Sequence, residues 1–162
     1  DWGSLGLVIL LSVFLMVPVA SAITSLFLDE VADAVEEKHY PDLTPVPPVS
    51  FWEGLRDTVS FLGVLITANL LAVILYVLLP FAAVFIFYAL NGYLLGREYF
   101  QLAAMRREGR AGAKALFKQH SGTIWAAGCL MALPLSFPLI NLMIPILGAA
   151  TFTHIYHRLS LR

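Results

Sequence analysis

Five polar residues interrupt otherwise apolar stretches of this sequence: Asn69, Asn91, Arg97, Glu98 and Asn141. A guanidinium group offers a fixed fork of N–H donors that fits an oxyanion, and Arg97 is therefore a candidate anion ligand. The asparagine amides could add further donors along the same path. Arg97 could equally form an ion pair with Glu36, Glu37 or Glu98, or extend its charged end toward water.

The spacing of these residues gives a first idea of how they face one another. Asn91 and Glu98 are seven positions apart, so on a helix they share one face, whereas Arg97 lies about 100° away. For each asparagine the simpler interpretation is a hydrogen bond between packed helices. The sequence predicts an anion path from these residue types, with structural bonding as the alternative.

Other chemistry finds little support. His154 and His157 have a spacing that can bind metal, but without a third ligand they fit a helix end better. The single Cys129 excludes a disulfide within the chain and spells no redox motif. No nucleophile elbow, phosphate loop or paired-carboxylate site occurs in the sequence. We expect no enzyme activity, no cofactor and no metal.

The elements that carry these residues are strongly apolar. The chain of 162 residues is 59% hydrophobic and 13% charged, whereas soluble domains are about 45–50% apolar and about 25% charged. Residues 2–28, 58–96 and 119–157 contain no Asp, Glu, Lys or Arg. Uncharged apolar runs of this length are typical of segments that lie in a lipid bilayer. The sequence predicts an integral membrane protein.

Backbone chemistry in lipid favours helices, because every N–H and C=O group needs a partner within the protein. The apolar stretches lack the strict alternation of barrel strands, so an all-α fold is expected. Breaks at Tyr40-Pro41, Pro80, the Gly109–Gly112 turn and the prolines after Leu133 divide the chain. The predicted helices cover residues 3–39, 50–79, 81–108, 112–133 and 138–158 of a single membrane domain.

The segment 58–96 would be about 58 Å long as one helix, far more than the roughly 30 Å that one crossing needs. Division at Pro80 leaves a full-length piece and a shorter one. The helix that precedes the tight polar turn at Gly109–Gly112 begins apolar and ends polar. The helix that follows this turn begins polar and ends apolar. We therefore expect long transmembrane helices combined with partly inserted, re-entrant helical hairpins.

Charges are unevenly distributed between the blocks. Residues 29–57 carry eight acidic residues against Lys38 and Arg56, while residues 97–118 carry six basic residues against Glu98 and Glu108. The positive-inside rule then places the basic turn and the C-terminal tail in the cytoplasm. The basic turn is interpreted as a topology signal or lipid contact, and no nucleic-acid binding is expected. Because residue 1 is Asp, a preceding N-terminal segment is also expected.

Three stretches resemble the CysZ-type sulfate permeases, which share a superfamily with the etoposide-induced membrane proteins. Residues 27–36 (FLDEVADAVE) are similar to an acidic helix that continues a membrane helix. Residues 91–100 (NGYLLGREYF) resemble the family's partly inserted hairpin, and residues 138–151 resemble its final segment. The family's Gly-Leu-Arg sulfate contact precedes its first long helix, so Gly54-Leu55-Arg56, after the acidic segment, is a coincidental match.

The resemblance implies a multi-pass protein of the bacterial inner membrane that admits sulfate, or a related oxyanion, for cysteine synthesis. It also implies a homo-oligomer, which would let subunits share a pore. Without a nucleotide-binding motif, transport would be channel-like or driven by a gradient. The alternatives are a membrane scaffold or lipid-organising protein without transport activity, and a subunit of a larger complex.

Overall fold

The computed structural model describes residues 1–47 and 50–161, and within its first helix it leaves the side chains of residues 14, 17, 18, 21, 22 and 25 undescribed. Throughout the described residues the fold is helical, without strands. The elements are α1 (Trp2–His39), α2 (Phe51–Leu78), η1 (Pro80–Ala82), α3 (Ala83–Gln119), α4 (Ser121–Ala132), η2 (Leu133–Ser136), α5 (Pro138–Asn141) and α6 (Ile144–Ser160). The all-α prediction is confirmed.

Local sequence rules account for several helix ends. Tyr40 and Leu79 each precede a proline and leave the helical region, as the proline ring requires of the residue before it. The start of α2 is fixed by a capping box, in which the Ser50 hydroxyl accepts from the Glu53 N–H at 3.3 Å and the Glu53 carboxylate accepts from the Ser50 N–H.

The break near residue 109 differs from the expected four-residue turn. Among the described residues Gly109 alone has a positive φ, 70°, and helical structure resumes at once and runs to Gln119. One left-handed residue suffices to reverse the chain, and the alanines and lysine that follow are good helix formers. A second break occurs at His120, so the region expected as one helix over 112–133 is divided between α3 and α4.

The last predicted helix, 138–158, is also divided. The structure has the short α5, then two turn residues, and then α6 beginning at Ile144. Pro145 explains the interruption, because in a helix interior it would remove a hydrogen bond and collide with the preceding turn. At the second position of α6 it lacks only an N–H that no helical carbonyl would accept.

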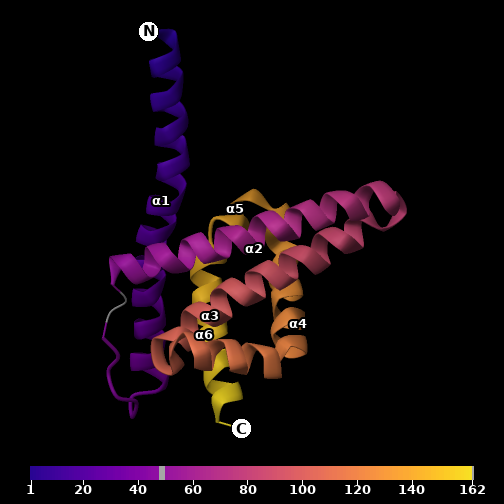
Figure 1. The fold of residues 1–162 in the computed structure, drawn as a ribbon. Helices are drawn as coiled ribbons and strands as arrows, with labels where there is room; N and C mark the ends of the chain where they lie inside the picture. Colours follow the sequence, from indigo (N-terminus) through magenta and orange to yellow (C-terminus); the bar gives the residue numbers. More distant parts are fainter. Residues whose placement is uncertain (48–49, 162) are drawn as a thin grey trace.

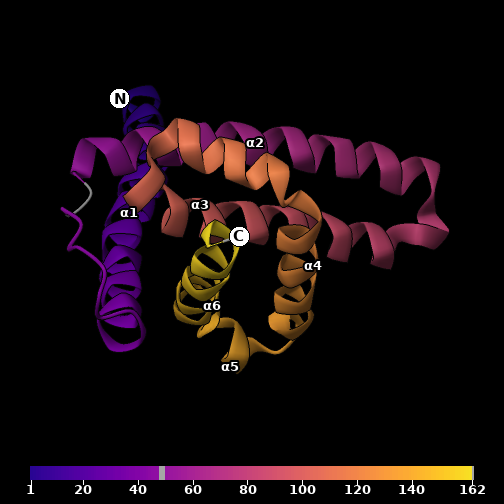
Figure 2. The ribbon, with the colours of Figure 1, turned by 90° about the horizontal axis from the view of Figure 1, so that it is seen from below.

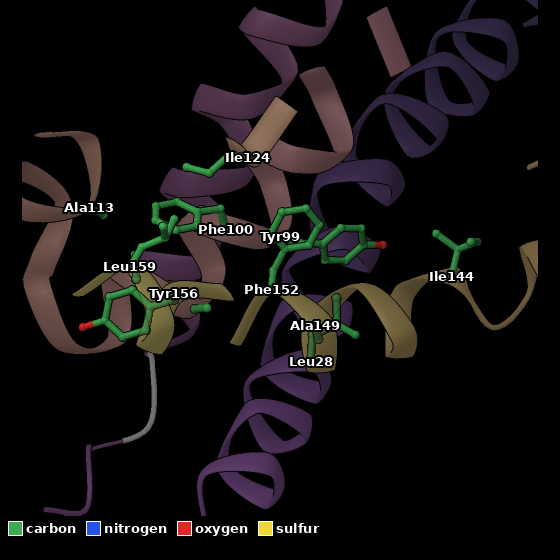
Figure 3. Close-up of a cluster of buried hydrophobic side chains, with 12 residues drawn as sticks. Leu28, Tyr99, Phe100, Ala113, Ile124, Ile144, Ala149, Phe152, Tyr156 and Leu159 are labelled. Carbon is green, nitrogen blue, oxygen red and sulfur yellow. The ribbon is translucent and has the colours of Figure 1, made fainter. Parts of the chain in front are cut away.

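The helices form two regions of different character. The N-terminal half of α1 projects away from the rest of the chain, and the α2–η1–α3 hairpin crosses α1 and runs outward (Figures 1 and 2). The C-terminal ends of α1 and α6 and the kink of α3 gather at one end, which we call the polar end. The core lies next to it, between α1, α3, α4 and α6, around Phe100 and Phe152, which are fully buried (Figure 3).

Glycines allow α3 and α4 to approach closely. A Cβ atom at Gly96 would lie 2.7 Å from the carbonyl oxygen of Ile124, and one at Gly128 would overlap the carbonyl oxygen of Gly92. Small residues at such crossings are common where helices pack in lipid. The contact fixes the inner part of α3, including Arg97, against α4.

Apolar side chains cover most of the surface away from the core. Within the described residues, α2 is the one helix long and apolar enough to cross a membrane, and only 6% of its most apolar window is buried. Exposed large side chains also occupy the bend between α2 and α3, where Phe81 and Phe85 are 84% and 78% exposed. Soluble monomers rarely expose apolar patches larger than a few hundred Å².

Candidate functional site

Arg97 lies on α3 and faces α2. Its guanidinium carbon is 6.0 Å from the centroid of the Phe61 ring, at the outer limit of a cation–π contact. The side chain is half-buried, and among the described residues no carboxylate forms an ion pair with it. The alternative in which Arg97 pairs with Glu36, Glu37 or Glu98 is therefore not seen among these residues. Its fork of donors is open to another acceptor.

The other predicted site residues are spread over three helices. The Asn69 amide donates to the Leu65 carbonyl at 2.8 Å, and the Asn91 amide donates to the Phe87 carbonyl at 2.9 Å. Both bonds stay within one helix turn, whereas bonds between helices were the simpler expectation. Glu98 on α3 and Asn141 at the end of α5 are exposed. No hydrogen bond or ion pair joins the five candidates within the described part of the chain.

The densest polar arrangement lies elsewhere, around Arg106 at the polar end. Its Nε atom is 2.5 Å from Asp29 Oδ1, its Nη2 atom pairs with Asp33, and its Nη1 atom lies 3.6 Å from Glu36 Oε2. The Arg106 side chain is only 2% exposed. One guanidinium from α3 thus meets three carboxylates from α1.

Arg107 and His157 complete the arrangement around Glu36. Arg107 donates from Nε to Glu36 Oε1 and from Nη2 to Glu36 Oε2, both at 2.8 Å. His157 Nε2 lies 2.7 Å from Glu36 Oε1. Arg107 Nη1 also donates to the Thr44 carbonyl at 3.2 Å. We call Arg106, Arg107, His157, Asp29, Asp33 and Glu36 together the charge cluster.

Helix periodicity and the kink explain how these residues meet. Asp29, Asp33 and Glu36 are spaced by four and three residues, so they lie on one face of α1. Arg106 and Arg107 lie three and two positions before the kink at Gly109, where α3 turns at the polar end.

Further contacts tie neighbouring elements to the cluster. Arg110 Nε donates to Asp57 Oδ1 of α2 at 2.8 Å, and the Tyr156 hydroxyl of α6 donates to Glu108 Oε1 at 2.8 Å. Asp57 and Arg110 are partly exposed, so their ion pair contributes less than those of Arg106. Four helices are thus joined at the polar end.

An aromatic and imidazole group extends the contact between α1 and α6. The Tyr40 hydroxyl lies 3.0 Å from His154 Nδ1, and its ring centroid is 4.4 Å from that of His157. The His39 and His154 rings meet edge to face with centroids 4.9 Å apart. Within the described residues no three His, Cys, Asp or Glu side chains are placed to hold a metal ion.

Comparison with known proteins adds a family to this geometry. The model of the family described as sulfate transporter CysZ/Etoposide-induced protein 2.4 matches residues 1–145. The chain belongs to the CysZ/etoposide-induced family. No curated protein and no solved structure matches it significantly.

In this CysZ-family chain the charge cluster favours the ionised form of Glu36. Burial raises the pKa of Glu36, but hydrogen bonds from Arg107 and His157 and the charge of Arg106 outweigh burial, so the pKa is lowered overall. The hydrogen bond to Glu36 raises the pKa of Arg107. The charge cluster thus joins α1, α3 and α6 through ion pairs and hydrogen bonds.

His154 differs in the direction of its titration. Burial, with the nearby His39 and His157 rings, lowers the pKa of His154, so the neutral imidazole is favoured in the folded chain. Its Nδ1 atom can then accept from the Tyr40 hydroxyl.

The sequence contains a pattern that could have indicated the charge cluster. One helix has an acidic face, and three arginines lie close to Gly109, so the two segments are complementary in charge. In the structure Arg106, Arg107 and Arg110 all bind carboxylates. These arginines were interpreted as a topology signal or lipid contact. The structure shows that they also join helices, because their partners lie on α1 and α2.

Proposed function

We propose that the chain is an integral membrane protein whose apolar helices are covered by lipid. The observation that supports this best is the inverted distribution of side chains. Only 6% of the apolar window of α2, the one described helix long and apolar enough to span a membrane, is buried, whereas Arg106, Asp29 and Glu36 are buried. In water this arrangement would leave a large apolar surface without cover, whereas lipid covers it at no cost.

The second half of the chain supports partial insertion. Twelve-residue α4 would be about 18 Å long, too short for a hydrocarbon core of about 30 Å. Its far end leads into exposed Phe137, Leu139 and Leu142 before α6 returns. We propose that α4 and α6 form a hairpin that enters the bilayer partway, with α5 at its tip.

The polar end supplies an orientation. Acidic and basic segments share this end, and the exposed Lys114, Lys118 and Arg158 add to the number of its basic residues. By the positive-inside rule we place the polar end in the cytoplasm, at the inner membrane of a bacterium.

The function that family and geometry support together is passage of sulfate or a related oxyanion, feeding cysteine synthesis. Arg97 is the residue that supports this most directly, because its guanidinium has no acidic partner among the described residues. A permeating oxyanion must exchange its water shell for such donors without being held too tightly. Copies of the chain in a homo-oligomer would enclose the path, with Asn69, Asn91, Glu98 and Asn141 as further lining candidates.

One observation favours the rival scaffold function. The amides of Asn69 and Asn91 donate to carbonyls of their own helices, as they would without any solute. In a scaffold the hairpins would shape the bilayer or bind partners, and Arg97 would stay bonded to water at the interface.

Flux of radiolabelled sulfate into liposomes that contain the purified chain tests the proposal, with chloride and phosphate as competitors. We expect saturable entry that resists both competitors and that falls at least about tenfold in Arg97→Gln. Arg56→Gln, an exposed arginine on α2, is the matched control and should keep its flux. Absence of flux from well-folded protein would favour the scaffold, and full flux in Arg97→Gln would remove Arg97 from the path.

A further inference from the structure

The Glu36 carboxylate is held by an unusual number of donors. It accepts two hydrogen bonds of 2.8 Å from the Arg107 fork, lies 2.7 Å from His157 Nε2, and has Arg106 Nη1 at 3.6 Å. Two guanidinium groups and an imidazole around two oxygens are the donor set that proteins use for oxyanions. Chemically, Glu36 occupies the place of a bound anion.

The donors are buried and incompletely used. The side chains of Arg106, Arg107 and His157 are 2%, 15% and 5% exposed. Arg106 Nη1 is buried and makes no hydrogen bond with the described residues. It lies 3.6 Å from Glu36 Oε2. This is longer than an N–H···O hydrogen bond, which usually spans about 2.7–3.2 Å between donor and acceptor. A tetrahedral anion presents more oxygens than a carboxylate, so it could serve this donor as well.

The acidic and the basic members of the charge cluster lie on different helices, so an external anion could replace the acids without displacing the donors. All three carboxylates that face the two arginines, Asp29, Asp33 and Glu36, belong to α1. The donors belong to α3 and α6, where Glu108 is engaged by the Tyr156 hydroxyl. If α1 moves, its acids leave together and uncover two arginines and an imidazole, a set whose charge matches a dianion.

We propose that Arg106, Arg107 and His157 form an oxyanion site whose occupant in this conformation is Glu36 of the same chain. An external oxyanion and the acidic face of α1 bind there in competition, so anion binding releases the C-terminal end of α1. Sulfate as the physiological anion rests on the proposed function, whereas the competition itself does not.

Binding of radiolabelled sulfate to the purified full chain in detergent, with ionic strength held constant by chloride, tests the competition. Glu36→Gln removes the competing charge with little change in shape, and we expect sulfate to bind about tenfold tighter or more. Glu37→Gln, the exposed neighbour, is the matched control and should bind as the unaltered chain does. Adding Arg107→Gln to Glu36→Gln should abolish the gain.

Two results would overturn the proposal: unchanged sulfate affinity in a folded Glu36→Gln variant, or a gain that survives the added Arg107→Gln. If Glu36→Gln does not fold, hydrogen exchange on the unaltered chain decides. Sulfate should then speed amide exchange in residues 30–39 relative to chloride at equal ionic strength, and equal exchange rates refute the competition. Liposome flux without binding at this site would leave the proposed function standing and remove only this inference.

Discussion

Replacing Arg106 by Met offers the sharpest test of how the polar end is held together. Met roughly preserves the length of the buried stem but removes the charge that faces Asp29, Asp33 and Glu36. Asp29 and Glu36 are 7% and 6% exposed at their side chains, so water cannot compensate them well. Removing one partner of a buried ion pair lowers stability by about 3–5 kcal/mol.

The magnitude follows from burial, and a second arginine on the same helix provides the comparison. Arg110 pairs with Asp57, but these side chains are 39% and 32% exposed. Exposed pairs contribute about 0–1 kcal/mol, because water and salt screen them. Arg110→Met should therefore lower the free energy of unfolding several times less than Arg106→Met does.

Unfolding of the detergent-solubilised chain, followed by circular dichroism during denaturant titration, measures both variants. Adding Asp29→Asn and Asp33→Asn to Arg106→Met should restore part of the loss, because fewer uncompensated charges then remain. Glu36 keeps its bonds to Arg107 and His157 in this triple variant. Equal losses for Arg106→Met and Arg110→Met, or no recovery in the triple variant, would refute the reasoning.

Two further predictions concern helix packing and pH. Gly128→Leu should separate α3 from α4 and lower the melting temperature by several degrees in a thermal scan, because even a Cβ there overlaps the Gly92 carbonyl. Gly122→Ala, which has open space, should leave it unchanged or raise it, and a loss as large as that of Gly128→Leu would contradict the packing. Because folding lowers the pKa of His154 from 6.5, the unfolded chain binds more protons. The contribution of His154 is therefore complete above about pH 6.5 and is lost as the pH falls toward the folded-state pKa. His154→Gln should flatten the stability profile in this range relative to His120→Gln, and identical profiles would contradict the shift.

The parts of the fold that local chemistry decides could be predicted from the sequence. Pro41 and Pro80 end helices because of steric contacts within two residues, and Gly109 supplies the positive φ of the kink. The restart of the helix at Ile144 was missed, although Pro145 favours a position in the first turn. The break at His120 has no such marker in the sequence.

The candidate site shows where sequence reasoning stops. Polarity within apolar sequence identified Arg97, but its contact with Phe61 depends on how α2 and α3 pack. The partners of Arg106 are 70 to 77 positions earlier in the chain, and several acids nearer in sequence were equally plausible. Pairing over such distances is decided by tertiary structure, so complementary charge patterns indicate only that a contact is possible.

The bonds between Glu36 and His157 also have a consequence for biosynthesis. The two residues are 121 positions apart, and at about 5–20 residues per second a ribosome needs roughly 6–24 s to make the intervening chain. Throughout this interval Glu36 lacks its imidazole partner, and for much of it Arg107 is not yet made either. Until its partners are made, the acidic face of α1 is therefore exposed to water. A nascent chain that is released before Arg106 of α3 is made would lack both arginines and would present that acidic face to the quality-control proteases of the cell.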